Sequence, residues 1–274
     1  MPELPEVETI RRSLEPHLVG QQITAVQVFR PRQLKNVTPV ELNRRLVGRR
    51  IAELGRRGKY LLVNLEGGEV LVVHLRMTGR LLFYPQGAAV TPYTRLLMAL
   101  TPPAQLHLHD MRSFAMVFLT TSEALPSLPG LVSLGPEPLG PAFTPQGLGK
   151  ALAKHRGPIK NVLLAQRVVA GLGNIYADEA LFRAGISPLR PANTLTAEEV
   201  TRLFTGIRAV LQEAIAAGGT SIRDYVNGQG APGAFQRQLA VYGRKGEPCR
   251  RCGTLLMGGR LAGRSTVFCP KCQL

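Results

Sequence analysis

Four cysteines near the carboxyl terminus have the spacing of a metal site. Cys249 and Cys252 form one Cys-x2-Cys pair, and Cys269 and Cys272 form a second pair after sixteen intervening residues. Such a pair folds into a tight knuckle that presents two thiolates to one tetrahedral ion. The chain contains no other cysteine, so the pattern favours metal binding over disulfide formation. We therefore predict one structural zinc ion.

The residues between the two cysteine pairs predict a basic hairpin. Arg260 and Arg264 flank a Leu-Ala-Gly sequence where a hairpin would turn, and apolar residues lie on either side of it. The metal would hold this positively charged tip in place. A zinc ribbon that only tethers the chain end is the alternative, but the two arginines favour a role in nucleic-acid binding.

The amino terminus offers a second kind of chemistry. If Met1 is removed, Pro2 presents a secondary amine, and because α-amino groups titrate at about 7.7–8.0, its unprotonated form is accessible near neutral pH. Such an amine can attack an electrophilic sugar carbon, and Glu3 beside it can protonate a leaving base or an opening sugar ring. Alternatively, Pro2 and Pro5 only pre-set the backbone of a helix whose positive end attracts Glu3 and Glu6. The residues alone leave both interpretations open.

The composition indicates a polyanionic partner. The chain has 34 Lys and Arg against 18 Asp and Glu, which gives a formal net charge of +16 spread along the sequence. This charge suits DNA, RNA or an anionic membrane surface, and the excess of Arg over Lys suits bidentate phosphate contacts. The apolar stretches are too short to span a membrane, and acidic residues stand where a signal peptide needs positive charge. We therefore expect a soluble, cytoplasmic protein.

The sequence pattern changes along the chain. Apolar residues at helical spacing from Val7 to Leu14 predict an opening helix that ends before Pro16. Residues 23–119 contain short segments rich in β-formers and separated by Gly or Pro, which predict a β-sandwich or barrel. Proline and glycine crowd residues 125–145, so this stretch predicts an interdomain linker.

Residues 196–217 have the clearest helical pattern of the second half. Apolar residues recur on one face, and Thr196 and Glu199 form a capping box at the start. Two glycines follow and end the helix.

A glycine-rich turn between two further helices suggests a phosphate contact. Residues 157–164 and 175–182 have helical patterns, and Gly171–Asn174 lies between them. The glycines let the backbone approach a phosphate, the second helix offers its positive end, and Lys160 and Asn174 add side-chain donors. A plain helical hairpin, with glycines that serve packing only, is the alternative.

Five motifs, taken as a set, resemble the bacterial formamidopyrimidine-DNA glycosylases. The match runs through nearly the whole chain, and the motifs stand in the order and at the spacing of the family. They are Pro2–Glu6, Gly58–Tyr60, His74–Gly79, Gly171–Ala177 and Gly263–Cys272.

The resemblance implies a bifunctional glycosylase and AP lyase. Such an enzyme excises 8-oxoguanine and formamidopyrimidines from duplex DNA and then cleaves the strand by β- and δ-elimination. The resemblance makes Pro2 the nucleophile that attacks C1′ and Glu3 the general acid. It assigns Lys59 to β-elimination and phosphate contact, and Arg264 to δ-elimination. Cations at these positions would meet the phosphates that flank a flipped nucleotide.

The resemblance also implies phosphate contacts. His74, Asn174 and Arg264 match phosphate-gripping positions, and Lys160 is a further expected contact. Two positions depart from the family, because Tyr93 and His155 align where relatives often have His and Lys. Both can still donate a hydrogen bond to a phosphate.

Three further side chains match those that fill the space left by the everted base. Arg112 would pair with the orphaned cytosine, while Met77 and Phe114 would wedge into the stack. Without the resemblance, a core methionine, a core phenylalanine and a solvated arginine would be the preferred interpretation. The segment Asp110–Phe114 departs from the family, which often has Asp-Pro-Arg-Arg-Phe there.

The combined fold prediction is α+β. We expect an N-terminal catalytic β-sandwich preceded by a helix at residues 1–130, and a linker at 131–145. A helical DNA-binding domain with a helix-two-turn-helix motif follows at 146–236, and a β-hairpin zinc finger at 237–274. The glycine-rich stretch after Ile222 matches the loop that closes over the damaged base, although the resemblance assigns no role to its single residues.

Two other functions remain possible at this point. An endonuclease VIII-like glycosylase would prefer oxidised pyrimidines, whereas Leu4-Pro5 and the set of Met77, Arg112 and Phe114 favour the purine-specific branch. A non-catalytic zinc-ribbon protein would bind nucleic acid with an inert Pro2. The favoured partner is duplex DNA that contains damaged bases, bound by a monomer that associates with the nucleoid when on DNA.

Overall fold

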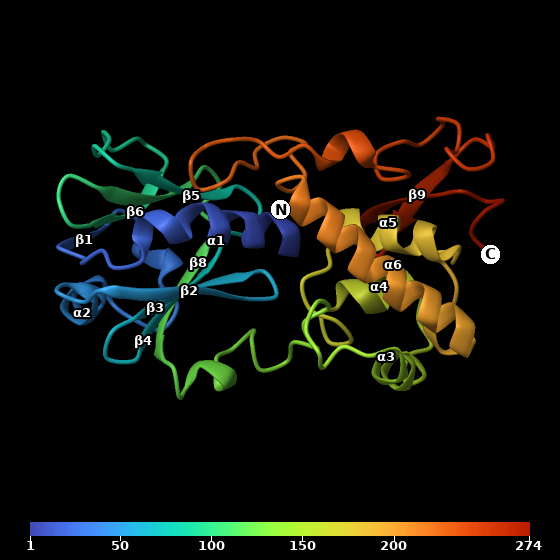
Figure 1. The fold of residues 1–274 in the computed structure, drawn as a ribbon, viewed down its shortest axis with the longest axis horizontal. Coiled ribbons are helices and arrows are strands. Elements are labelled where there is room, and N and C mark those ends of the chain that lie inside the picture. The colour runs from blue at the N-terminus through green and yellow to red at the C-terminus, as the bar shows by residue number, and fades with distance from the viewer. The chain divides into compact units, whose positions relative to one another are not determined.

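The computed structural model describes all residues, 1–274, and divides into two compact units (Figure 1). The first unit contains Met1–Val132 and Ala217–Ala234, and the second contains Ser133–Ala216 and Phe235–Leu274. Each unit therefore consists of two separate segments of the sequence. The cysteine-containing segment groups with the helices, and the segment after the longest helix groups with the sandwich.

The first unit is a β-sandwich of two antiparallel four-stranded sheets, with strand orders β1-β6-β7-β5 and β2-β3-β4-β8. Alternate residues of each strand face inward, for example Leu61, Val63 and Leu65, and form one apolar core. Two short 3-10 helices, η1 (Pro31–Gln33) and η2 (Leu125–Ser127), lie outside the sheets. The other elements are α1 (Leu4–Leu18), β1 (Ala25–Val28), α2 (Pro39–Leu46), β2 (Ile51–Arg57), β3 (Tyr60–Leu65), β4 (Glu69–His74), β5 (Gly79–Tyr84), β6 (Thr94–Ala99), β7 (Gln105–Asp110) and β8 (Met116–Thr121).

Helix α1 packs against β2 and β3 of one sheet and against β5 of the other (Figure 1). Leu14 and Leu18 are fully buried on its inner face, and burial of each such side chain stabilises the fold by about 1.5–3 kcal/mol. The predicted end before Pro16 is wrong, because the helix continues to Leu18 with Pro16 inside it. The burial of Leu18 outweighs the hydrogen bond that proline cannot donate.

The segment 217–234 packs against α1 and β5. Gly228 N donates to Ser13 Oγ at 2.9 Å, and Phe83 N donates to Gly228 O at 2.9 Å. A Cβ on Gly228 would lie 2.4 Å from Leu14, so only glycine lets the backbone approach this closely. The glycine-rich stretch matched to the lesion-capping loop is thus anchored on the helix that begins beside Pro2.

The second unit contains four α-helices and a β-hairpin. The predicted capping box of α6 is present, because Thr196 N donates to Glu199 Oε2 at 2.8 Å and Glu199 N donates to Thr196 Oγ1 at 3.3 Å. The α+β architecture predicted from the sequence is confirmed. The elements are α3 (Pro145–Leu152), α4 (Ile159–Leu164), α5 (Asn174–Ala184), η3 (Ala192–Thr194), α6 (Ala197–Ala216), η4 (Phe235–Gln238), β9 (Met257–Leu261) and β10 (Arg264–Phe268).

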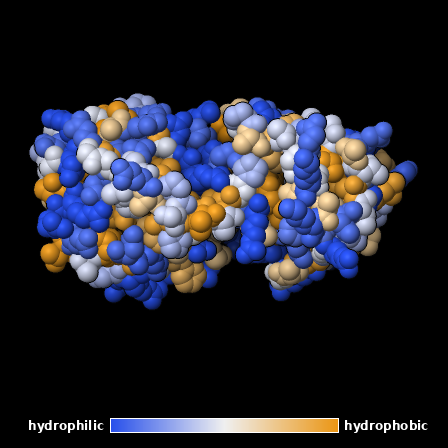
Figure 2. Space-filling model, turned by 90° about the horizontal axis from the view of Figure 1, so that it is seen from below, coloured by the Kyte–Doolittle hydropathy of each residue, from blue (hydrophilic) through white to orange (hydrophobic).

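The surface seen in Figure 2 is mostly hydrophilic on each unit, with small apolar patches between polar side chains. None of the helices has the length and apolar character that crossing a membrane would require.

Candidate active site and nucleic-acid interface

Pro2 and Glu3 are buried at the N-terminus of α1, and Glu3 is 3% exposed. Glu3 is the N-cap residue of a capping box with Glu6: Glu3 N donates to Glu6 Oε2 at 2.8 Å, and the Glu3 side chain accepts from the Glu6 backbone. The second oxygen of Glu6 accepts a hydrogen bond from Thr220 N at 2.8 Å. The helix-capping interpretation and the chemical interpretation of this terminus are therefore compatible, because capping fixes Glu3 beside Pro2.

Lys59 lies in a two-residue turn between β2 and β3, since Arg57 pairs with Tyr60 across the hairpin. Gly58 has a φ of 55°, a left-handed conformation that favours glycine. Lys59 is 7% exposed. The backbone of the turn therefore fixes where the Lys59 side chain begins.

His74 ends β4 directly opposite Tyr60, so it lies beside the Lys59 turn. Burial lowers the pKa of His74 to about 3, and the positive charges of Arg76 and Lys59 add to the effect. The neutral ring accepts a hydrogen bond from Arg76 N at Nδ1, at 3.0 Å, which leaves the hydrogen on Nε2. His74 is therefore a neutral donor, which suits a phosphate oxygen.

Met77, Arg112 and Phe114 lie together on the surface of the first unit. The guanidinium carbon of Arg112 lies 4.7 Å from the centroid of the Phe114 ring, and Arg112 Nη1 lies 3.5 Å from Met77 Sδ. Met77 and Phe114 are each 44% exposed. The alternative of a core methionine and a core phenylalanine is excluded.

Asp110 holds this surface cluster in place. Its carboxylate is 1% exposed and accepts from Thr78 Oγ1 at 2.5 Å, Ala115 N at 2.7 Å and Arg112 N at 3.2 Å. Sequence reasoning assigned Asp110 no role. The signal was strand alternation, because Leu106 and Asp110 share the inner face of β7, where a carboxylate requires partners.

Tyr93 and His155 occupy different surroundings. Tyr93 is 49% exposed, and its carbonyl accepts from Asp110 N at 2.9 Å, so it adjoins the base of the Met77–Phe114 region. His155 follows α3 in the second unit, where it is half-buried and lines a pocket of about 400 Å³ with Asn161 and Arg167. Phosphate contact by Tyr93 and by His155 stays a prediction.

Lys160 corrects the sequence prediction of a phosphate contact. Its side chain is fully buried, with Nζ 2.7 Å from Asp178 Oδ1, and it donates to Ser265 O at 2.6 Å and to Thr266 Oγ1 at 3.0 Å. Burial raises the pKa of Asp178 to about 7, although the Lys160 ammonium opposes this rise. Through these internal partners Lys160 joins α4 and α5 to β10.

Asn174 and Asp178 also hold strand β10. Asn174, the first residue of α5, donates from Nδ2 to the carbonyl and the hydroxyl of Ser265, each at 3.0 Å. Asp178 Oδ2 accepts from Val267 N at 3.3 Å. The two helices predicted to form a DNA clamp therefore hold Ser265, the residue next to Arg264.

The four cysteines gather at one point beside β9 and β10. Cys252 Sγ lies 3.6 Å from Cys269 Sγ, and Cys249 Sγ lies 4.0 Å from Cys272 Sγ, with all four sulfurs within 4.8 Å of one another. A zinc ion with four sulfurs at 2.3 Å requires sulfur separations of about 3.8 Å. The four thiolates therefore fit a tetrahedral zinc ion.

Arg264 is exposed at the tip of the hairpin. Ala262 and Gly263 both have positive φ, 46° and 75°, which defines the two-residue turn, and Arg264 pairs with Leu261. The predicted basic hairpin is present. The cysteine cluster at its base and the Asn174 contact at Ser265 fix the strand that carries Arg264.

The chain matches three described domain families in succession. Residues 1–117 match the formamidopyrimidine-DNA glycosylase N-terminal domain, residues 134–226 match the formamidopyrimidine-DNA glycosylase H2TH domain, and residues 246–274 match the zinc finger found in FPG and IleRS. The third match and the sulfur geometry identify the four cysteines as the ligands of one structural zinc ion.

Relatives match along almost their full length. The chain is 53% identical to the formamidopyrimidine-DNA glycosylase of Moorella thermoacetica over 92% of both chains. The crystal structure of the MutM (Fpg) protein from Thermus thermophilus is 46% identical, with a TM-score of 0.89 over 99% of this chain and 98% of that one. A Lactococcus lactis FPG variant in complex with a Fapy-dG containing DNA is 38% identical, with a TM-score of 0.94 over 99% of both chains. The chain belongs to the formamidopyrimidine-DNA glycosylase family.

Proposed function

We propose that Pro2 and Glu3 perform the chemistry of this protein, which is a base-excision DNA glycosylase and AP lyase for oxidised purines. The observation that carries the assignment is the buried start of α1, where the capping box with Glu6 fixes Glu3 next to the residue whose nitrogen becomes an amine once Met1 is removed. The substrates are 8-oxoguanine and formamidopyrimidines in duplex DNA.

The reaction begins with attack of the Pro2 nitrogen on C1′ of the damaged nucleotide. The glycosidic bond breaks, the base leaves with its electron pair, and Glu3 supplies a proton to the departing base or to the opening sugar ring. The proline nitrogen loses its proton, and the C1′–O4′ bond opens as its electron pair goes to O4′, which leaves an iminium at C1′. The resulting iminium acidifies the C2′ proton, whose removal expels the 3′ phosphate. We assign Lys59 to this β-elimination and Arg264 to the following δ-elimination, which releases the 5′ phosphate.

Phosphate contacts are assigned to His74, Asn174 and Arg264, with Tyr93 and His155 as further contacts. Because the side-chain amide of Asn174 is bonded to Ser265, Asn174 contributes through the positive start of α5. The neutral state of His74 supports its assignment, because the hydrogen bond that its Nδ1 accepts fixes the tautomer and leaves a hydrogen on Nε2. Arg112 pairs with the orphaned cytosine while Met77 and Phe114 fill the stack. Their joint exposure supports this assignment.

The proposal also includes the domain organisation and the cellular location. The catalytic β-sandwich spans residues 1–130 and the linker 131–145. The DNA-binding helical domain spans 146–236 in the sequence, although its segment 217–234 packs with the β-sandwich, and the zinc finger spans 237–274. The protein acts as a monomer in the cytoplasm and is associated with the nucleoid when it is on DNA.

Borohydride trapping tests the role of Pro2. The mature protein is incubated with duplexes that carry 8-oxoguanine or thymine glycol and then reduced, so that an iminium becomes a covalent protein-DNA adduct. We expect an adduct with 8-oxoguanine at far lower protein concentration than with thymine glycol. Protein that is acetylated at the Pro2 nitrogen should form no adduct, whereas mock-treated protein should form it. Equal trapping by the acetylated and the mock-treated protein would exclude Pro2 as the nucleophile.

A further inference from the structure

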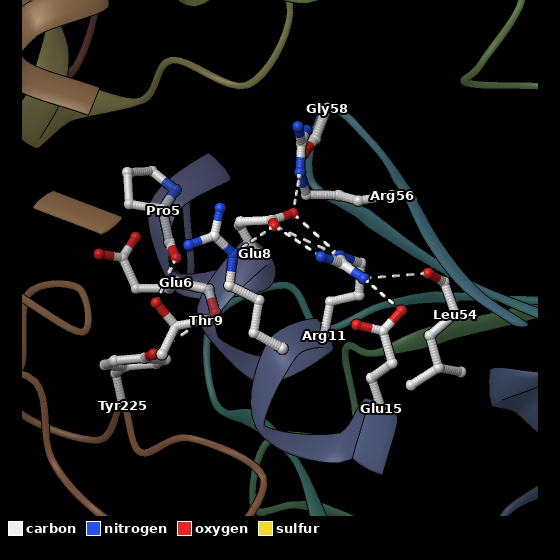
Figure 3. A network of polar contacts seen from close by, with 11 residues as sticks. Pro5, Glu6, Glu8, Thr9, Arg11, Glu15, Leu54, Arg56, Gly58 and Tyr225 are labelled. Carbon is white, nitrogen blue, oxygen red and sulfur yellow. Dashed lines mark hydrogen bonds and ion pairs between the residues drawn. The ribbon is translucent and has the colours of Figure 1, made fainter. Parts of the chain in front are cut away.

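Glu8 is a buried carboxylate to which none of these steps assigns a role. It lies on α1 with 8% exposure and is surrounded by three arginines (Figure 3). Arg12 Nε lies 2.7 Å from Oε1, Arg11 Nη2 lies 3.0 Å from Oε1, and Arg56 Nε lies 3.2 Å from Oε2. Although burial acts to raise the pKa of Glu8, the arginines lower it to about 2. The carboxylate is therefore ionised throughout the neutral range.

Arg56 connects Glu8 to the turn between β2 and β3. Its Nε donates to Glu8 Oε2, while its Nη1 donates to the carbonyl of Gly58 at 3.0 Å (Figure 3). A guanidinium group is a rigid planar fork, so fixing one nitrogen aims the others. That carbonyl belongs to the peptide that joins Gly58 to Lys59, so the contact orients the residue assigned to β-elimination.

The same contact sets the spacing between two elements. Glu8 lies on the helix that begins beside Pro2 and Glu3, whereas Gly58 and Lys59 form the turn between β2 and β3. The Glu8–Arg56 bridge therefore links the helix of the nucleophile to the turn of the lysine. Arg11 strengthens this attachment, since its Nη1 donates to Leu54 O on β2 at 3.3 Å.

From these contacts we infer that Glu8 and Arg56 are positioning residues, which hold the Lys59 ammonium in register with the Pro2 amine for strand cleavage. The inference rests on the proposed roles of Lys59 and Pro2. It predicts that loss of the bridge slows the elimination that Lys59 promotes more than it slows formation of the Pro2 adduct.

The experiment compares single-turnover strand cleavage with borohydride trapping on a duplex that holds a preformed abasic site. In Glu8→Gln and in Arg56→Gln, cleavage should slow about 10- to 100-fold, the cost of a misplacement near 1 Å, while trapping changes by less than about 3-fold. Arg12→Gln is the matched control. It removes the 2.7 Å pair with the same carboxylate, but Arg12 is 59% exposed and has no contact with the hairpin, so both rates should stay within about 2-fold of wild type.

A double-mutant cycle with Lys59→Ala decides how the effect is transmitted. If Lys59→Ala slows cleavage and Glu8→Gln adds no further loss in its presence, Glu8 acts through Lys59. If the two losses multiply, or if cleavage and trapping fall equally in Glu8→Gln, the positioning role is refuted while that of Lys59 stands. If Lys59→Ala leaves cleavage unchanged, the proposed role of Lys59 fails and the inference fails with it. Should Glu8→Gln not fold, Arg56→Gln carries the same cycle, because it leaves Glu8 paired with Arg11 and Arg12.

Discussion

Replacement of Lys160 by methionine tests whether Lys160 forms a buried ion pair or contacts a phosphate. The substitution leaves the Asp178 carboxylate buried beside one backbone donor, Val267 N. Breaking a buried pair on one side costs about 3–5 kcal/mol. We therefore expect Lys160→Met to lower the free energy of unfolding by about 3–5 kcal/mol at pH 7.5.

The pH dependence of this loss has a definite sign. Removal of Lys160 takes away the charge that opposes the raised pKa of Asp178. A carboxyl group whose pKa is raised by folding binds more protons in the folded state, so its cost grows as pH rises from 3.8 towards the folded pKa. The destabilisation should therefore be smaller at pH 5 than at pH 7.5. Adding Asp178→Asn should restore at least half of the lost stability, since no carboxylate is then left unpaired.

Urea denaturation of Lys160→Met, the Lys160→Met/Asp178→Asn double variant and Lys150→Met measures these differences. Lys150 is exposed on α3, so its substitution should change stability by less than about 0.5 kcal/mol. DNA binding is measured in parallel as a function of salt. If Lys160→Met has wild-type stability but lowers the slope of log K against log salt by about one, Lys160 contacts a phosphate and the buried ion pair is refuted.

Three further predictions concern acid, metal and the surface cluster. Folding lowers the pKa of His74 to about 3, and burial on β7 lowers the pKa of His107 to about 4. Protonation of the unfolded chain therefore destabilises the protein as pH falls below 6.5. Between pH 7.5 and 5 each histidine should lower the free energy of unfolding by about 2 kcal/mol. In urea titrations, His107→Gln should lose about 2 kcal/mol less than the wild type over this pH range. Zinc chelation should release one metal per chain, unfold the hairpin seen by amide exchange, and slow δ-elimination more than adduct formation. Asp110→Asn should raise the Kd for a lesion duplex about 10-fold. It should also reduce the preference for cytosine opposite the lesion, and Kd values for duplexes with cytosine or adenine at that position measure this preference.

The parts of the fold that sequence predicted correctly depend on neighbours along the chain. The hairpin turn at Gly263, the capping box at Thr196 and the cysteine knuckles each involve residues a few positions apart. Helix α2 was missed although Thr38 caps it and Pro39 begins it, because the β-rich pattern on both sides dominated that region. In that region, the short helix-start signal at Thr38 and Pro39 was outweighed by the β-forming residues that surround it.

The errors and omissions arise from contacts between distant residues. Lys160 is buried by contacts with Asp178, Ser265 and Thr266, and the last two lie more than a hundred positions further along the chain. The link between Glu6 and Thr220 likewise spans most of the chain. A basic residue near a glycine turn is compatible with a phosphate contact or with a buried ion pair, and the sequence holds no local feature that distinguishes them.

Buried charge in this protein adjoins the residues assigned to chemistry. The Glu8–Arg56 bridge meets the turn of Lys59, and the Lys160–Asp178 pair meets the strand of Arg264. Buried ion pairs are weak evidence for stability, because well-packed apolar side chains often replace them at no cost. Apolar replacements could keep each fold element in place, but they could not direct a hydrogen bond to the Gly58 carbonyl or to Ser265. These pairs are therefore best explained by the backbone that they orient, and a high net charge alone does not reveal which cations face DNA.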